Sequence, residues 1–312
     1  MRFPSAPAWA LLAGAALWGV VWYPYRLMAQ AGIDGLWSTF FTYGIALVGG
    51  IAIFPRQARI LRRPGPWAIL MGLAIGWSNL AYVLGVLEGE VMRVLLLFYL
   101  APLWTVPLAR LLLDERLDRT GVAVMAIALA GAATMLWHPE MGLPWPHGKA
   151  EWLGLFAGFL FALGNVLVRK LAHMTDPEKS IVIWAGVVVA SLVHLPASHV
   201  PANDALAQAV HAWPLVAGVG VALIAMSLAL QYGLSRLPAN RAIVILLSEL
   251  VIAAVAAYAL AGEVLRARDW IGGGLIIAAT ILSTYSSRQE RTAGPREALA
   301  STPSSGAPPP RS

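Results

Sequence analysis

Apolar stretches of about 20 residues follow one another along nearly the whole chain, and they constrain its fold most. Each is long enough to cross a hydrocarbon core of about 30 Å as a helix. Of 312 residues, 59% are hydrophobic and 12% are charged, whereas soluble domains carry about 25% charged residues. Ten such stretches lie at residues 8–29, 35–54, 66–87, 91–113, 119–137, 151–172, 180–200, 211–233, 240–262 and 268–287. The sequence therefore predicts an all-α, polytopic membrane protein with ten transmembrane helices.

The basic residues predict how these helices are oriented. With the N-terminus placed inside, 17 of the 22 Lys and Arg residues fall on the inner side. By the positive-inside rule, this bias places both termini in the cytoplasm. We expect a multi-pass protein of the bacterial inner (plasma) membrane. The net charge of +6 lies in short loops and a tail, so we expect no nucleic-acid partner.

A weak internal repeat divides the ten stretches into two halves. Residues 85–117 and 233–265 match at an offset of 148, with identical residues at Gly85/Gly233, Arg93/Arg241, Glu115/Glu263 and Leu117/Leu265. Five helices per half is an odd number, so the second half enters the membrane inverted, as in many transporters. We predict one five-helix repeat at 1–143, an inverted repeat at 144–287, and a disordered cytoplasmic tail at 288–312.

Glu249 is the most informative single residue. It follows Arg241 by eight positions, or about 12 Å along a helix, which is close to mid-membrane. A carboxylate there is costly unless it is protonated, paired or facing water. Three interpretations remain open: Glu249 binds a substrate ammonium group, carries a proton, or holds helices together through hydrogen bonds.

Aromatic and polar residues at membrane depth form a second group of candidates. Their N–H and O–H groups need partners in hydrocarbon. These side chains either form hydrogen bonds between helices or line a water-filled cavity, and we favour the cavity. With Glu249, the predicted substrate-binding residues are Trp18, Trp22, Trp77, Ser78, Asn79, Tyr82, Tyr99, Trp104, Asn165, Ser227 and Gln231.

Other chemistry is not indicated. The chain has no cysteine, and its six histidines are scattered without ligand spacing, so we expect no metal. There is no phosphate-binding loop of the kind that ATP-driven transport needs. We therefore predict a protein that is not an enzyme and that uses no cofactor.

Two motifs resemble the EamA repeat of the drug/metabolite transporter superfamily. One runs from Ser248-Glu249-Leu250 to Gly262-Glu263-Val264-Leu265, and the other from Ala101-Pro102-Leu103 to Asp114-Glu115-Arg116-Leu117. The opening GAALWGVVWYPYR is similar to the first helix of these exporters. The resemblance covers about residues 8–287. It departs from the family pattern at Ala101, where an acidic residue can occur, and at Leu250, where proline is usual, which puts a proline kink in helix nine in doubt.

The resemblance implies a ten-helix exporter whose cavity is lined by helices one, three, four, six, eight and nine. The predicted aromatic cavity most resembles that of aromatic amino acid exporters of the YddG type. We therefore expect a secondary transporter that exports amino acids by alternating access, with amino acids and the lipid bilayer as partners. A monomer is compatible with this interpretation. The alternatives are an exporter of other metabolites or drugs, and a non-transporting receptor or assembly subunit.

Overall fold

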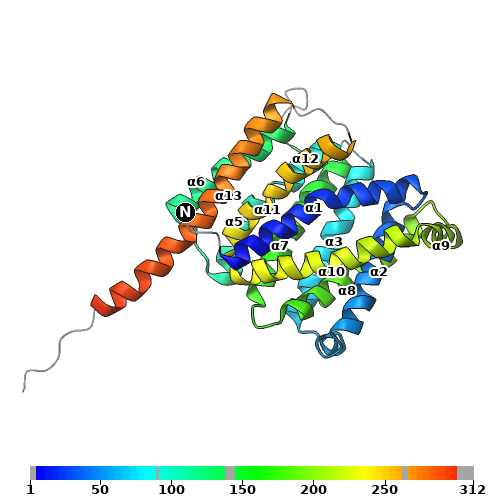
Figure 1. The fold of residues 1–312 in the computed structure, drawn as a ribbon, viewed down its shortest axis with the longest axis horizontal. Coiled ribbons are helices and arrows are strands. Elements are labelled where there is room, and N and C mark those ends of the chain that lie inside the picture. Colours follow the sequence, from blue (N-terminus) through cyan, green and yellow to red (C-terminus); the bar gives the residue numbers. More distant parts are fainter. Residues whose placement is uncertain (1–4, 89–90, 138–144, 262–265, 301–312) are drawn as a thin grey trace, which may run out of the picture.

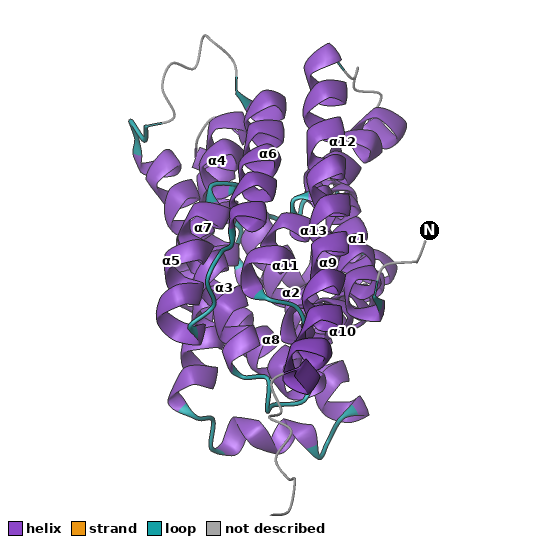
Figure 2. Cartoon of the chain, turned by 90° about the vertical axis from the view of Figure 1, so that its left-hand side faces the viewer, coloured by secondary structure: helices purple, strands orange, loops and turns teal. Residues whose placement is uncertain are grey.

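The computed structural model describes residues 5–88, 91–137, 145–261 and 266–300, and over these residues the regular structure is helical, as the sequence predicts. Figures 1 and 2 show the helices side by side in one bundle. They are α1 (Ala6–Gln30), α2 (Gly35–Ile53), η1 (Gln57–Arg62), α3 (Pro66–Glu88), α4 (Val91–Phe98), α5 (Ala101–Leu113), α6 (Arg119–Leu136), α7 (Lys149–Lys170), α8 (Asp176–His194), η3 (Leu195–Ala197), α9 (Ala202–His211), α10 (Trp213–Arg236), α11 (Ala239–Leu246), α12 (Ser248–Ala261) and α13 (Ala267–Ala300).

Nine helical segments of the described residues are long and apolar enough to cross a membrane. They correspond to the first nine predicted spans, and α13 carries the tenth. In Figure 1, α13 runs beside α6 and then extends beyond the bundle. It continues as helix to Ala300, over residues for which the composition predicts disorder. A helix that is already nucleated in the bundle extends at little cost. Residues 143 and 144, the predicted boundary between the halves, lie outside the described residues.

The surface of the bundle is apolar. Leu111 is 80% exposed, Val48 68% and Trp270 69%. Large apolar side chains at such exposure are unfavourable in water and favourable against lipid chains. The exposed side chains therefore fit a membrane-embedded bundle, whereas the backbone groups are satisfied within each helix.

The first helix of each predicted half packs on the other half. Helix α1 contacts α10, α11 and α12, whereas α7 contacts α3, α4 and α5. Helix α2 lies against α10, and α8 lies against α3. We call α3, α4, α5, α7 and α8 the first bundle, and α1, α2, α10, α11 and α12 the second bundle. The two bundles meet along the seam between α2 and α8.

Glycines allow α3 and α8 to approach backbone to backbone. A Cβ added at Gly186 of α8 would overlap the carbonyl of Gly72, and one at Gly76 would overlap the carbonyl of Gly186. Small residues at such spacing permit close helix packing in membranes. The α3–α8 contact therefore holds the first bundle together.

We predict that Gly186→Ala lowers the stability of the folded protein by about 1–3 kcal/mol, because backbone atoms cannot move aside for the added methyl group. The thermal unfolding midpoint in detergent measures this loss of stability. Gly44→Ala on α2 is the matched control, since a Cβ there meets no atom within 4 Å. Equal midpoints in the two variants would contradict the close packing.

Candidate functional site

The fourth predicted span is broken in the middle. Tyr99 and Leu100 separate α4 from α5. The Leu100 N–H donates to the Leu97 carbonyl at 3.3 Å, a spacing of three residues in place of the four of an α-helix. Pro102, the second residue of α5, has no N–H to donate. The break therefore leaves backbone polar groups in the interior of the span.

The ninth predicted span is broken at the equivalent place. Leu247, which follows Tyr99 by 148 residues, separates α11 from α12. The Leu250 N–H donates to the Leu247 carbonyl at 3.1 Å, and the Ser248 hydroxyl donates to the Ile245 carbonyl at 2.7 Å. The sequence left a bend here in doubt because Leu250 replaces proline. The break forms without proline, and the Ser248 hydroxyl satisfies one of the carbonyls at the end of α11.

Glu249 lies in the first turn of α12, directly after this break. Its carboxyl group and the Tyr99 hydroxyl form a side-chain hydrogen bond, and Tyr82 lies close enough for a Coulombic interaction. The positive end of the α12 dipole favours negative charge at this position. Glu249 therefore bonds to one tyrosine hydroxyl, lies near a second and sits at a helix N-terminus, and a carboxylate held in this way can still accept a bond from a cation.

Aromatic rings from three helices surround the Tyr99 side of the site. The Phe98 ring centroid lies 5.2 Å from that of Tyr82, 5.3 Å from that of Tyr99 and 5.3 Å from that of Phe161. We call these four residues the aromatic cluster. It places apolar ring faces beside a carboxyl group, an arrangement that suits an amphipathic organic ligand.

Glycines bring the first helix of each half against the two breaks. A Cβ at Gly19 of α1 would lie 2.9 Å from the Glu249 carbonyl oxygen. A Cβ at Gly158 of α7 would lie 2.5 Å from the Phe98 carbonyl oxygen. Each break is therefore packed against a helix of the other half, and both belong to one central region.

Four of the predicted site residues each have a buried polar atom without a hydrogen-bond partner. The atoms belong to α1, α5, α7 and α10, and are Trp18 Nε1, Trp104 Nε1, Asn165 Nδ2 and Gln231 Oε1. Leaving such a group unpaired costs about 1–3 kcal/mol. These unpaired atoms are thus candidates for contact with a polar ligand.

The sequence profile of the EamA-like transporter family matches residues 6–137 and 148–285. The chain belongs to the EamA-like transporter family. The two matched stretches together cover most of the chain, and each contains one of the broken spans. This EamA-family protein is accordingly a membrane transporter, a class whose members are generally not enzymes.

Two relatives agree with this assignment. An uncharacterized transporter of Archaeoglobus fulgidus is 27% identical over 289 residues, which cover 91% of this chain and 97% of the relative. A protein of known crystal structure superposes with a TM-score of 0.71 at 18% identity, over 92% of this chain and 99% of the other. At that identity the similarity shows a shared fold alone, and neither relative's name specifies a substrate.

Several predicted site residues of this EamA-family protein make contacts between helices. The Ser78 hydroxyl donates to the Ala157 carbonyl at 2.9 Å, and the Ser227 hydroxyl accepts from Trp184 Nε1 at 2.9 Å. Trp77 packs beside Leu36, Leu80 and Ala190. The Asn79 amide contacts the Tyr43 hydroxyl at 3.5 Å, whereas the Trp22 ring lies edge-on to Tyr23 of its own helix. Of the predicted residues, the structure brings Tyr82, Tyr99 and Glu249 together at the breaks.

Sequence reasoning missed Phe98 and Phe161 of the aromatic cluster. Phe98 directly precedes Tyr99 in the segment FYLAP, so an aromatic pair before a proline was the signal available. Phe161 lies on α7, and only the packing of α7 against α4 places it at the site. Within the described part of the chain, no group of three or more His, Asp or Glu residues is arranged to hold a metal ion.

Proposed function

We propose that this EamA-family protein is a secondary transporter that exports amino acids, aromatic ones among them, by alternating access. The observation that carries the proposal is the hydrogen-bonded pair of Glu249 and Tyr99 beside the aromatic cluster, at the point where two spans are broken. Broken helices with half-helix ends at mid-span are typical of substrate sites in transporters built from inverted repeats.

Each part of an aromatic amino acid has a counterpart in the site. The Glu249 carboxylate suits the ammonium group, and the ring faces of the aromatic cluster suit the side chain. The Asn165 amide and the Trp18 indole N–H are buried donors without partners, so they suit the carboxylate. An exporter of other metabolites or cationic drugs would use the same carboxylate and rings without needing the buried donors.

Counterflow into proteoliposomes tests this proposal with three compounds that share one ring. Tryptophan carries both charged groups, tryptamine lacks the carboxylate, and indole-3-propionate lacks the ammonium group. We expect exchange to be fastest with tryptophan. Faster exchange with tryptamine would favour the alternative of an amine or drug exporter. A panel in which no amino acid exchanges would contradict amino acid export.

The proposed topology has ten spans and both termini in the cytoplasm of a bacterial inner membrane. The chain lacks cysteine, so single introduced cysteines report their side cleanly. We predict that Asn203→Cys on α9 reacts with an impermeant maleimide added outside intact cells, whereas Gln57→Cys on η1 does not. External labelling of Gln57→Cys would contradict the orientation. A third informative position, Gly142, lies outside the described residues.

A further inference from the structure

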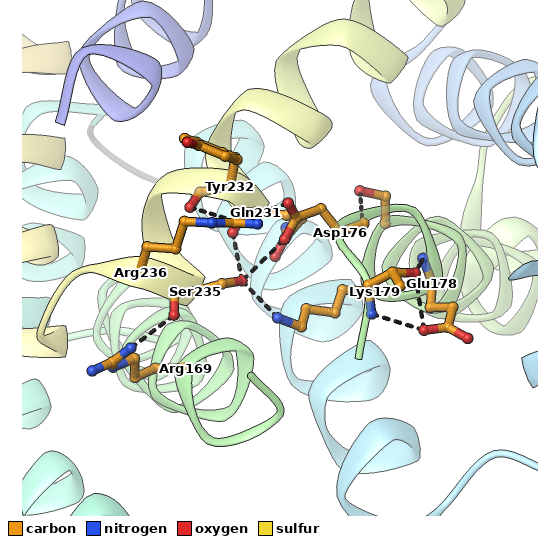
Figure 3. A network of polar contacts seen from close by, with 10 residues as sticks. Arg169, Asp176, Glu178, Lys179, Gln231, Tyr232, Ser235 and Arg236 are labelled. Atoms are coloured by element: carbon orange, nitrogen blue, oxygen red, sulfur yellow. Dashed lines mark hydrogen bonds and ion pairs between the residues drawn. The ribbon is translucent and has the colours of Figure 1, made fainter. Parts of the chain in front are cut away.

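A network of charged and polar side chains joins α8 to α10 on the side of the bundle where α1 begins (Figure 3). The buried Lys179 amine donates to the Ser235 hydroxyl at 2.6 Å. Arg236 pairs with Asp176 at 2.9 Å between Nη1 and Oδ2. We call Asp176, Lys179, Ser235 and Arg236 the Ser235 network. Since α8 belongs to the first bundle and α10 to the second, the network crosses between the bundles.

Glu115, two residues after the end of α5, makes a second connection on the same side. Its Oε1 accepts from Arg169 Nε at 3.2 Å, and its Oε2 accepts from the Ala239 N–H at 2.8 Å. Arg169 also donates to the Ser235 carbonyl at 2.7 Å. Glu115 and Arg169 belong to the first bundle, whereas Ala239 begins α11 of the second bundle. The two connections therefore share Arg169 and act on one interface.

Two further polar contacts lie within the first bundle. Arg93 of α4 pairs with Glu151 of α7 at 2.7 Å near one end of α7. Near the other end, the Lys170 amine donates to the Leu112 carbonyl of α5 at 3.0 Å. These contacts hold α4, α5 and α7 to one another, so the Ser235 network and Glu115 contacts can separate without disrupting the first bundle.

The seam between α2 and α8 is tied at its opposite end. Asp34, the N-cap of α2, accepts a bond from the Ser198 hydroxyl, and Trp37 Nε1 donates to the Val200 carbonyl at 3.0 Å. Both partners follow η3 after α8. A seam fixed at that end can act as a pivot about which the two bundles separate at the Ser235 end.

A charged interface suits a contact that must open repeatedly. The ions lose hydration when the bundles close, and this loss offsets much of their attraction. When the bundles separate, water returns to the same ions, so opening costs little. An apolar interface of equal area would lose its full burial energy on opening. The composition of the contact therefore fits two states of similar free energy.

We propose that the Ser235 network and the Glu115 contacts form a lock that closes one side of the transporter and releases when that side opens to substrate. The inference rests on the proposed alternating access, and with the proposed topology the locked side is cytoplasmic, where an exporter takes up its cargo. In this lock, the carboxylates of Asp176 and Glu115 hold together the cations Arg169, Lys179 and Arg236.

Removing the two anions tests the lock. In Asp176→Asn/Glu115→Gln, three cations remain close together without the two carboxylates that join the bundles, so the bundles should repel each other. Spin labels at Ala6, where α1 begins, and His173, between α7 and α8, measure the separation in the full chain by pulsed electron resonance. We expect a second, longer distance, with the ratio of open to closed molecules raised at least about tenfold.

Two controls make the result decisive. Glu178→Gln removes a carboxylate from the same turn of α8. Glu178 bonds to Thr175 at the start of its own helix and acts through its charge on Lys179 of that helix, so neither interaction crosses between the bundles, and the distances should match the unsubstituted protein. Labels at Gly65 and His173 lie within the first bundle and should keep one distance in the double variant, which shows that it is folded. An unchanged Ala6–His173 distance in the folded double variant would overturn the lock.

The measurement needs no substrate, so it separates the lock from the proposed cargo. A longer distance together with no amino acid exchange would leave the lock standing and contradict amino acid export. Amino acid exchange with unchanged distances would support amino acid export and contradict the lock.

Discussion

Glu249→Gln should weaken the affinity for tryptophan by at least about tenfold, with little change in thermal stability. Gln keeps the size of the side chain and its hydrogen bond to Tyr99, but it cannot form the charge-assisted bond to an ammonium group, which is worth about 1.5–3 kcal/mol. The affinity should be weakened at every pH, with or without a gradient, if Glu249 binds substrate. Concentration dependence of counterflow at two pH values measures it.

The same variant separates the other two roles of Glu249. A proton carrier predicts that Glu249→Gln abolishes stimulation by a pH gradient. A structural Glu249 predicts neither effect, and destabilisation only in Glu249→Leu, which leaves the Tyr99 hydroxyl without its partner. Glu178→Gln serves as the control for loss of a carboxylate far from the site. Unchanged affinity and unchanged gradient response in Glu249→Gln would contradict both functional roles.

The sequence predicted the helical spans well, because apolar length is a local property of the chain. It also placed Glu249 near the middle of the ninth span, which runs from Ala239 to Leu260. The break at Leu247 was not predictable in the same way. It depends on the Ser248 hydroxyl bonding to the Ile245 carbonyl, whereas the familiar signal for a break, proline, is missing from position 250.

Contacts between helices that are far apart in the chain could not be predicted from the sequence. Lys179 counted only as one of the inner-side charges, because nothing local indicates that Ser235 is its partner 56 residues later. Trp77 and Tyr82 are both aromatic residues of one helix, yet Trp77 packs toward α8 and Tyr82 toward Phe98. The position of a residue along its span could be derived from the sequence, but the direction in which each side chain faces required the packing.

The direction in which the side chains face also underlies the second prediction with a large expected effect. Tyr99→Ala should reduce tryptophan counterflow per folded molecule at least about tenfold, because it removes a ring of the aromatic cluster and the hydroxyl partner of Glu249. Tyr99→Phe keeps the ring and loses only the hydroxyl, so its defect should be smaller. Tyr82→Ala should also reduce counterflow, since Tyr82 belongs to the same cluster.

Trp77→Ala is the contrasting variant on α3. Its ring packs beside Leu36, Leu80 and Ala190, so truncation leaves a cavity and should destabilise the protein by about 3–5 kcal/mol. The folded fraction should still bind tryptophan with unchanged affinity. A stable Trp77→Ala protein with weakened affinity would place Trp77 in the substrate site after all. Normal transport in all three alanine variants would mean that the aromatic cluster is packing and that substrate binds elsewhere in the bundle.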